Sequence, residues 1–255
     1  MNPILELNDI SYSYHTLDGE TKALSNISFS LSPGEFTAVV GPSGCGKSTL
    51  LSLIAGLMKA ENGQICLNGE PLTENSSKIG YMLQHDHLFE WRSIYRNVLL
   101  GAEINKALTP EIKQRASELL EQYGLKHFAR SKPSELSGGR RQRAALIRTL
   151  LLDPELLLLD EPFSALDYQT RLTVSDDIGQ IIRCSGKTAL LVTHDLSEAV
   201  SLSDRVIILS KRPASIVRIV PITFALEKDT PLNRRNAPEF KNYFNEIWKE
   251  LNRDE

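Results

Sequence analysis

A glycine-rich segment at residues 41–49 contains the first side chains whose types and spacing indicate chemistry. It follows the pattern G-x-x-x-x-G-K-[ST], which is typical of loops that wrap phosphate groups. Glycines let the backbone turn successive N–H groups toward one anion, and a following helix points its positive end at the same place. The predicted phosphate-binding residues are Gly41, Pro42, Ser43, Gly44, Cys45, Gly46, Lys47 and Ser48.

Three side chains of this loop have distinct predicted roles. Lys47 supplies a mobile positive charge for the β- and γ-phosphates of a nucleoside triphosphate, and the Ser48 hydroxyl is a candidate ligand for Mg²⁺. Cys45 lies beside a helix N-terminus, a position that favours a reactive thiolate. The alternative, which we favour, is a small side chain with no part in catalysis, whose alkylation blocks nucleotide by bulk alone.

A second candidate site follows four consecutive leucines at residues 156–159. The run predicts a buried strand, and Asp160 and Glu161 then lie at its carboxyl end, where open α/β sheets bind ligands. Asp160 is a candidate Mg²⁺ ligand, and Glu161 is a candidate general base for an attacking water. His194 follows the next buried apolar run and is expected at the same sheet edge, near the γ-phosphate, Glu161 and the water.

Residues 136–143, Leu-Ser-Gly-Gly-Arg-Arg-Gln-Arg, open a predicted helix. Ser137 is suited to cap its N-terminus, and Gly138 and Gly139 leave backbone N–H groups exposed. This is a second anion site in a chain with one phosphate loop. The arrangement therefore suggests two copies of the chain, each completing the phosphate site of the other.

The ordered motifs resemble those of the nucleotide-binding subunit of ATP-binding cassette (ABC) transporters. They span about Tyr14 to Ser210 and comprise GPSGCGKST at 41–49, Gln84, LSGGRRQR at 136–143, LLLLDEP at 156–162, SALD at 164–167 and His194. The resemblance implies an ATPase that uses ATP and Mg²⁺ and that works as a head-to-tail dimer with ATP between the copies.

The resemblance also implies individual roles. Tyr14 stacks on adenine, with Tyr12 as the rival, and the phosphate loop extends to Thr49. Gln84 joins Ser48 and Asp160 around Mg²⁺, and Glu161 and His194 carry hydrolysis. The signature residues Ser137, Gly138 and Gly139 meet the ATP held by the other copy, and Asp167 lies in the segment that crosses between copies. Arg140 departs from the usual glutamine at its position, which places interface charge or nucleotide affinity in question.

Residues 84–92 resemble the Q-x-D-x-L-x-x-W-R pattern of ATPases that serve nitrate, sulfonate, taurine and aminopyrimidine importers. The resemblance implies integral membrane permease subunits as partners, a solute-binding protein as an indirect partner, and a peripheral position on the cytoplasmic face of the membrane. The apolar residues Leu88, Phe89 and Trp91 have two interpretations. They form a groove for a short helix of the membrane subunit, or they pack inside a helical subdomain.

The elements expected to position these residues are short apolar strands separated by helices. Continuous apolar runs predict a mixed, mostly parallel sheet with an antiparallel β edge, in the α/β class and, by the resemblance, a P-loop NTPase core. The expected strands are 4–7, 36–40, 64–67, 79–83, 156–160, 189–193, 205–210 and 216–220. Helices are expected at 48–58, 109–123 and 139–152, and the turn signals are Asn62-Gly63 and Asn68-Gly69.

One ATPase domain is expected in four segments. Residues 1–84 form the first half of the core, 85–152 an inserted α-helical subdomain, 153–220 the second half of the core, and 221–255 a tail. The tail contains a predicted amphipathic helix at 238–251, with its apolar side made by Phe240, Phe244, Ile247, Trp248 and Leu251.

Composition restricts the function further. The 255 residues carry a net charge of −3, which argues against nucleic acid as a partner. The three cysteines are scattered and indicate a reducing cytosol, and neither a secretory signal nor a membrane-spanning run is expected. Arginines 140, 141, 143 and 148 could suggest nucleic acid, but their helical spacing favours salt bridges within the subdomain and the ATP interface.

Three alternatives remain at this point. An exporter or lipoprotein-release ATPase shares the motifs but commonly lacks a tail of this kind. A cassette ATPase of DNA repair or translation control would contain a long coiled-coil insertion or a second cassette, and neither is present in the sequence. A nucleotide kinase would use the phosphate loop but has no need of Leu-Ser-Gly-Gly.

Overall fold

The computed structural model describes residues 2–17, 19–72 and 78–253. Within it the chain forms two compact units. The first unit is built from both ends of the chain, up to Ser76 and from Gly179 onward, and the second comprises Ser77–Ile178. Each unit contains some of the predicted site residues and is described by itself.

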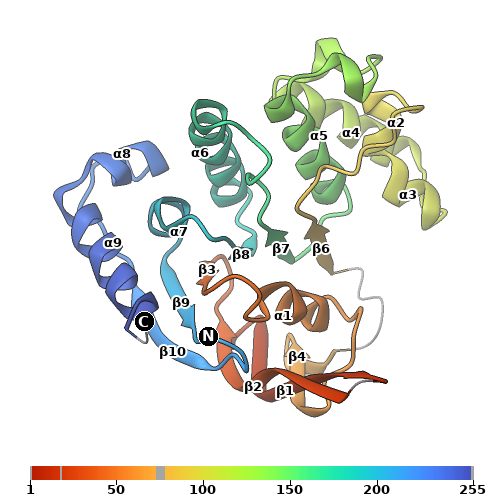
Figure 1. Ribbon diagram of the computed structural model, residues 1–255. Helices are drawn as coiled ribbons and strands as arrows, with labels where there is room; N and C mark the ends of the chain where they lie inside the picture. Colours follow the sequence, from red (N-terminus) through yellow and green to blue (C-terminus); the bar gives the residue numbers. More distant parts are fainter. Residues whose placement is uncertain (1, 18, 73–77, 254–255) are drawn as a thin grey trace. The chain divides into compact units, whose positions relative to one another are not determined.

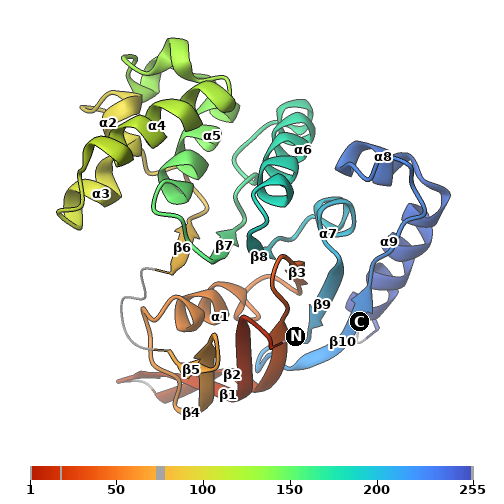
Figure 2. The ribbon, with the colours of Figure 1, turned by 180° about the vertical axis from the view of Figure 1, so that it is seen from behind.

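A four-stranded antiparallel sheet opens the first unit (Figure 2). Its strands are β1 (Leu5–Thr16), β2 (Gly19–Leu31), β4 (Asn62–Leu67) and β5 (Glu70–Pro71), in the order β2-β1-β4-β5. The predicted antiparallel β edge is confirmed, and the segments 4–7 and 64–67 belong to it as paired strands, with Leu5 opposite Leu67. The Asn68-Gly69 turn joins β4 to β5 with positive φ at both residues, whereas Asn62-Gly63, predicted as a turn signal, begins β4 itself.

The strands predicted for this sheet were too short or were missing. β1 continues to Thr16, and β2 was not predicted at all. The β1 backbone shifts register near Asp9, and both Asp9 and Asn26 have positive φ, so bulges interrupt the period-two pattern that identifies a strand. The first four residues of β2 are exposed, which leaves no apolar face to recognise there.

Parallel strands form the second sheet of this unit. β3 (Phe36–Val40) pairs in parallel with β8 (Thr188–Val192) and β9 (Arg205–Leu209), and β10 (Ile216–Pro221) is an antiparallel edge next to β9. Every residue of β3 and β8 is buried, which explains their continuous apolar sequences. The bounds match the predicted strands to within one residue.

Helices α1 (Lys47–Ile54), α7 (Leu196–Leu202), α8 (Pro231–Asn236) and α9 (Pro238–Leu251) complete the first unit. Figure 1 shows α7 and α9 beside β9 and β10. The predicted tail helix is confirmed, and Ile247 is fully buried in a cluster with Val220 and Ile222. Trp248 was wrongly placed on the apolar side: it is 55% exposed and stacks on Phe244.

Ion pairs attach the tail to the rest of the first unit. The buried Arg234 on α8 pairs with Asp229 inside the tail through two nitrogens, and it donates a hydrogen bond of 2.7 Å to the carbonyl of Ser203 outside the tail. On α9, Glu246 and Glu250 pair with Arg218 of β10 at 2.6 and 3.1 Å. The tail is therefore an integral layer of the first unit.

The second unit is mainly helical. It contains the parallel pair β6 (Ile79–Met82) and β7 (Leu156–Asp160) and the helices α2 (Ile94–Val98), α3 (Leu100–Ile104), α4 (Pro110–Gln122), α5 (Gly138–Leu150) and the first part of α6 (Tyr168–Cys184). Two single 3₁₀ turns, η1 (Lys126–Phe128) and η2 (Pro133–Glu135), connect α4 to α5. The expected absence of strands from 85 to 152 is confirmed, because this fully described stretch is helix and loop.

An apolar cluster joins helices α2, α4 and α5 of this unit. It includes Leu88, Ile94 and Val98, which pack with Leu120 of α4 and Ile147 of α5. Across the described parts of the chain, no helix combines the length and the apolar character needed to cross a bilayer.

Candidate functional site

The phosphate loop of the first unit joins the buried end of β3 to the start of α1. Gly46 caps α1 with φ at +124°, a conformation that favours glycine. A Cβ at this position would also lie 2.9 Å from the Leu24 side chain. Both the backbone conformation and the lack of space therefore require glycine here, and the helix N-terminus stays open toward an anion.

The Lys47 ammonium folds back over this loop. Its Nζ donates hydrogen bonds to the carbonyls of Gly41 at 2.8 Å and Pro42 at 3.1 Å, and the residue is 7% exposed. A positive charge is thus held at the mouth of the loop before any phosphate arrives. Because phosphate oxygens are stronger acceptors than neutral carbonyls, this ammonium has a ready partner in a bound triphosphate.

The thiol of Cys45 is buried inside the loop and is 1% exposed. Burial raises the pKa of this thiol above its ordinary value, and this effect outweighs the nearby charge of Lys47, which lowers it. The environment therefore opposes a reactive thiolate and agrees with the interpretation of Cys45 as a small loop residue.

Tyr14, near the end of β1, is tied to this loop. Its hydroxyl lies 2.9 Å from Oγ1 of Thr49 in α1, and its ring meets that of Tyr12 edge-on with centroids 5.1 Å apart. Tyr14 is 37% exposed, so part of the residue is accessible at the surface beside the loop. Of the two tyrosines, Tyr14 is the one with a direct bond to the phosphate-binding segment among the described contacts.

His194 leaves the carboxyl end of β8, next to the strand that leads into the phosphate loop. The neighbouring residues are held firmly: the buried Thr193 hydroxyl donates 2.7 Å to Glu198, and Asp195 caps α7 by accepting from the N–H groups of Ser197 and Glu198. His194 itself is exposed. The sequence reasoning missed Thr193 and Glu198, although an acid within the apolar run of α7 is a signal for a buried hydrogen bond.

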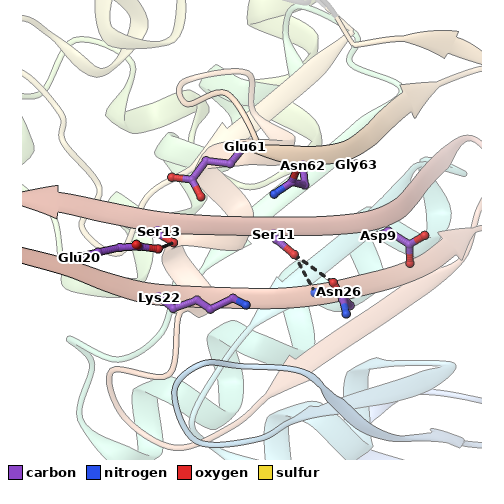
Figure 3. A pocket seen from close by; sticks show the side chains of 9 residues that line it. All are labelled: Asp9, Ser11, Ser13, Glu20, Lys22, Asn26, Glu61, Asn62 and Gly63. Carbon is purple, nitrogen blue, oxygen red and sulfur yellow. Dashed lines mark hydrogen bonds between the residues drawn. The ribbon is translucent and has the colours of Figure 1, made fainter.

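A polar pocket of about 560 Å³ lies elsewhere in the first unit, on the antiparallel sheet (Figure 3). Its side chains bond with one another: Ser13 donates 2.7 Å to Glu20, and Ser11 donates 3.2 Å to Asn26. None of the predicted site residues lines it. The lining residues are Asp9, Ser11, Ser13, Glu20, Lys22, Asn26, Glu61, Asn62 and Gly63.

The acidic motif belongs to the second unit and ends β7. Asp160 is buried, and the hydroxyl of Tyr81 on the paired strand β6 donates 3.3 Å to its Oδ2. Sequence reasoning did not single out Tyr81, because strand pairing rather than sequence spacing brings it beside Asp160. The carboxylate is thus oriented at the end of the strand, as the motif predicts.

Glu161, the next residue, has a left-handed backbone with φ at +45°. A non-glycine residue in this region carries strain, which tends to occur at functional positions. Its carbonyl accepts the N–H of Ser164 at 3.1 Å and the hydroxyl of Ser164 at 2.9 Å. Gln84, which follows β6, donates a hydrogen bond from its amide Nε2 to the hydroxyl oxygen of Ser164 at 3.3 Å. The structure therefore brings Gln84 and Glu161 together through Ser164, a residue that the sequence motif SALD contains but did not explain.

The glycine pair of the signature segment begins α5. Ser137 is the N-cap residue, as predicted, but its side chain makes no capping hydrogen bond. A Cβ on Gly139 would lie 2.5 Å from Val174 of α6, and one on Gly138 would lie 2.8 Å from Leu166. The glycines therefore allow the start of α5 to pack closely against neighbouring segments of its own unit, and the Ser137 hydroxyl is exposed.

The four arginines of α5 have partners within the second unit. Arg140 lies over the Phe128 ring at 4.3 Å, and Arg143 pairs with Asp177 at 2.8 Å. Arg141 pairs with Asp86 at 3.1 Å, and Arg148 donates to the carbonyls of Asp86 and His87. Arg141 and Arg143 thus form salt bridges, as expected, whereas Arg140 contacts a ring and Arg148 contacts backbone carbonyls.

The predicted site residues thus fall into two sets. The first unit contains Tyr14, the loop 41–49 and His194, and the second contains Gln84, Asp160, Glu161 and the signature residues. Within each set the geometry fits a role in binding a nucleoside triphosphate.

Comparisons with known proteins show the family of this chain. The family model described as "ABC transporter" matches residues 24–164. The chain is 45% identical over 248 residues to the uncharacterized ABC transporter ATP-binding protein YtlC of Bacillus subtilis, covering 97% of this chain and 95% of that protein. It is 40% identical over 250 residues to the nitrate import ATP-binding protein NrtD of Synechocystis sp. (95% and 93% covered). It is also 40% identical over 232 residues to the aliphatic sulfonates import ATP-binding protein SsuB of Bacillus subtilis (91% and 88% covered).

Solved structures give the same result. The dimeric post-hydrolysis structure of the ATP-binding cassette MJ0796 with ADP and Pi is 30% identical, with a TM-score of 0.69, and covers 84% of this chain and 99% of that one. The structure of cbiO1 from Clostridium perfringens, part of the ABC transporter complex cbiONQ, is 27% identical, with a TM-score of 0.75 and coverage of 87% and 89%. The chain therefore belongs to the ATP-binding proteins of the ABC transporter family: it is an ATPase with the P-loop NTPase fold.

Proposed function

We propose that this protein is the ATP-hydrolysing subunit of an ABC importer for a small solute of the nitrate, sulfonate, taurine or aminopyrimidine kind. The observation that carries this proposal is the 40% identity to relatives named for nitrate import and aliphatic sulfonates import, over 95% and 91% of the chain. The segment 84–92, with its Q-x-D-x-L-x-x-W-R pattern, supports the same group.

Solute uptake tests this proposal. The chain is expressed in Bacillus subtilis cells that lack SsuB, and in Synechocystis cells that lack NrtD, and uptake of labelled alkanesulfonate or nitrate is measured. Restored uptake in either host is expected, and the Lys47→Ala variant should restore none. A chain that hydrolyses ATP but restores neither activity would contradict an importer of this group.

ATP would be held mainly by the first unit. Tyr14, which is partly exposed beside the loop, would stack its ring on adenine. The loop 41–49 would offer backbone N–H groups and the Lys47 ammonium to the phosphates. The fit rests on the open helix N-terminus at Gly46 and on a lysine whose present acceptors are weaker than phosphate.

The residues that would hold Mg²⁺ are Ser48, Gln84 and Asp160. They offer a hydroxyl, an amide oxygen and a carboxylate, which is the all-oxygen donor set that this hard cation prefers. The orientation of Asp160 by Tyr81 supports the fit, because hydrogen bonds around the ligands orient the ligands. When bound, Mg²⁺ neutralises charge that develops on the phosphates during transfer.

Hydrolysis would be carried by Glu161 and His194. Glu161 accepts a proton from the attacking water, and its backbone is held by two hydrogen bonds from Ser164. His194 contacts the γ-phosphate from the end of β8. Replacing Glu161 with Gln keeps the shape and removes the base, so turnover should fall about 1,000-fold while ATP binding remains.

A second copy of the chain would complete the site in a head-to-tail dimer. The exposed Ser137 and the start of α5, with Gly138 and Gly139, would meet the γ-phosphate of ATP held by the partner subunit. ATP links both copies and hydrolysis removes the link, because ADP does not bridge them. The interface therefore has a closed and an open state, and the γ-phosphate of ATP favours the closed one. The dimeric state of the related MJ0796 cassette supports dimer formation by this chain.

The partners in the membrane would be permease subunits, served in turn by a solute-binding protein. Leu88 is buried in the helical core, but Phe89 is 37% and Trp91 72% exposed, and their rings stack with centroids 4.6 Å apart. An exposed aromatic pair suits a short amphipathic helix from a permease. The protein would then lie peripherally on the cytoplasmic face of the membrane, and the segments 1–84, 85–152, 153–220 and 221–255 would act as one ATPase domain.

Loss of this aromatic pair tests the docking site. Trp91→Ala should separate the protein from permease-containing membranes while leaving nucleotide binding intact. Trp248→Ala is the matched control, because it also removes an exposed tryptophan that stacks on a phenylalanine. Equal membrane retention of both variants would place the docking surface elsewhere.

A further inference from the structure

We propose that Ser164 is a positioning residue that selects the amide orientation of Gln84, so that the amide oxygen and not the nitrogen is presented to the divalent cation. The inference rests on the proposed function, which makes Gln84 a ligand of that cation. It concerns three residues of the second unit, and each contact lies within that unit.

The hydroxyl hydrogen of Ser164 is already used. Ser164 Oγ donates to the carbonyl oxygen of Glu161 at 2.9 Å, and the Ser164 N–H donates to the same oxygen at 3.1 Å. A serine hydroxyl has one hydrogen and two acceptor lone pairs. Toward any other group, Ser164 Oγ can therefore act only as an acceptor.

Gln84 must respond to that constraint. Its amide group lies 3.3 Å from Ser164 Oγ, and an oxygen that only accepts requires the NH₂ side of the amide to face it. The inverted amide would place two acceptors against each other. Since the amide is planar, fixing the nitrogen fixes Oε1 on the other branch, and Oε1 is the atom that Mg²⁺ or Mn²⁺ binds.

Ser164 is the rigid member of the pair. The two bonds to Glu161 close a tight turn that begins at the left-handed backbone of Glu161. Arg171 of α6 donates to the carbonyls of Ser164 at 3.4 Å and Leu166 at 3.0 Å, which fixes the same segment from the other end. Gln84, by contrast, is exposed. A fixed acceptor therefore orients an exposed side chain.

The consequence is a contribution to metal affinity from a residue that does not touch the metal. Without the hydroxyl, both amide orientations of Gln84 are open, and the cation must select one. Loss of a partner that orients a ligand typically costs 10- to 100-fold in metal affinity. Because the Gln84 contact is exposed and 3.3 Å long, we expect the lower end of this range, about tenfold.

The test measures metal binding and needs no turnover. The full chain is titrated with a non-hydrolysable ATP analogue, once with Mn²⁺ and once with EDTA, and the ratio of the two affinities gives the contribution of the metal. Electron paramagnetic resonance of Mn²⁺ reports the bound metal directly. The variants are Ser164→Ala, Ser164→Thr and Gln84→Ala. Ser117→Ala is the control, because it removes a hydroxyl on α4 that donates only to a helix carbonyl among the described contacts.

We expect the ratio of the two nucleotide affinities to fall about tenfold in Ser164→Ala and in Gln84→Ala, with the affinity measured in EDTA unchanged. Ser164→Thr and Ser117→Ala should keep the wild-type ratio. If Gln84→Ala loses metal affinity and Ser164→Ala does not, the orienting role of Ser164 is overturned and the ligand assignment stands. If neither variant changes the ratio, Gln84 is not a ligand, and the metal assignment under the proposed function fails with this inference. If Ser164→Ala loses affinity for the ATP analogue equally with Mn²⁺ and with EDTA, Ser164 has a general structural role, and the proposal is overturned.

Discussion

Two glycine-rich helix starts, one in each unit, look alike in sequence but are built differently. At the start of α1, Gly46 lies in a positive-φ conformation and Lys47 places an ammonium group over the loop. At the start of α5, Gly138 and Gly139 serve close packing against Leu166 and Val174 of the same unit. The basic residue that follows them, Arg140, is directed onto the Phe128 ring.

The difference separates two ways of using a helix N-terminus. The α1 site combines N–H groups, the helix dipole and the Lys47 charge, the combination that we propose binds the triphosphate. The α5 site offers backbone donors and one serine hydroxyl without a dedicated cation, so it should bind phosphate weakly by itself. Such a weak second site suits a contact that forms only when ATP already occupies the first.

Removing Lys47 should have the largest effect on the difference between the helix starts of α1 and α5. Lys47→Ala deletes the charge that distinguishes the α1 site, and we expect ATP affinity to fall about 100-fold, as for loss of one charge-assisted hydrogen-bond set. Equilibrium nucleotide titration measures the effect. Lys59→Ala, which removes an exposed lysine after α1, is the control and should bind like wild type. If both variants lose the same ATP affinity, Lys47 contributes only through the net charge of the protein.

The packing role of the α5 glycines is tested by adding one methyl group. Gly139→Ala would place a Cβ 2.5 Å from Val174, and overpacking of this kind costs about 1–3 kcal/mol in the free energy of unfolding. Thermal or urea unfolding measures the loss. Combining it with Val174→Ala should recover part of the stability. A double variant no more stable than Gly139→Ala would show that the contact with Val174 is not the cause.

Thiol labelling sharpens the description of the α1 loop. Burial raises the pKa of Cys45, so its thiolate fraction at neutral pH is small and grows as the pH rises. Cys184 is exposed and serves as the reference. We expect maleimide to label Cys45 more slowly than Cys184 at pH 7. Mass spectrometry locates the label, and full labelling of Cys45 should abolish ATP binding; undiminished binding would refute the steric interpretation.

The smallest expected effect concerns Arg140. Arg140→Gln removes an exposed cation–π contact with Phe128, which is worth about 0.5–1 kcal/mol of stability. Because the guanidinium is engaged within its own unit, ATP-dependent dimer formation should remain within about twofold of wild type. Unfolding and light scattering measure the two effects. A large gain in dimer formation would show instead that Arg140 acts at the interface between copies.

The sequence predicts the parts of this fold whose signals are local. β3 and β7 have continuous buried apolar runs, and their bounds agree with the structure to the residue. α9 is likewise correct because Pro238 starts a strongly amphipathic run. β2 was missed because its first four residues are exposed and its pairing to β1 is irregular, so the strand depends on tertiary contacts more than on pattern.

The same distinction applies to the candidate site. The phosphate loop and the acidic motif are contiguous, so their residues are visible in the sequence. Tyr81 meets Asp160 only through strand pairing, and Ser164 meets Gln84 only through a turn that starts at the left-handed Glu161. Residues that position others are recognised from three-dimensional contacts, because no fixed spacing connects them to the groups they hold.

The central claim, a phosphate site shared between two copies, is tested most directly by light scattering coupled to size exclusion on the Glu161→Gln variant. This variant should keep ATP binding, because the carboxylate is replaced by an amide of the same shape. With ATP and Mg²⁺ it should shift from monomer to dimer, and with ADP it should remain monomeric. A variant that binds ATP yet stays monomeric, both as it stands and with Arg140→Gln added, would contradict the shared site.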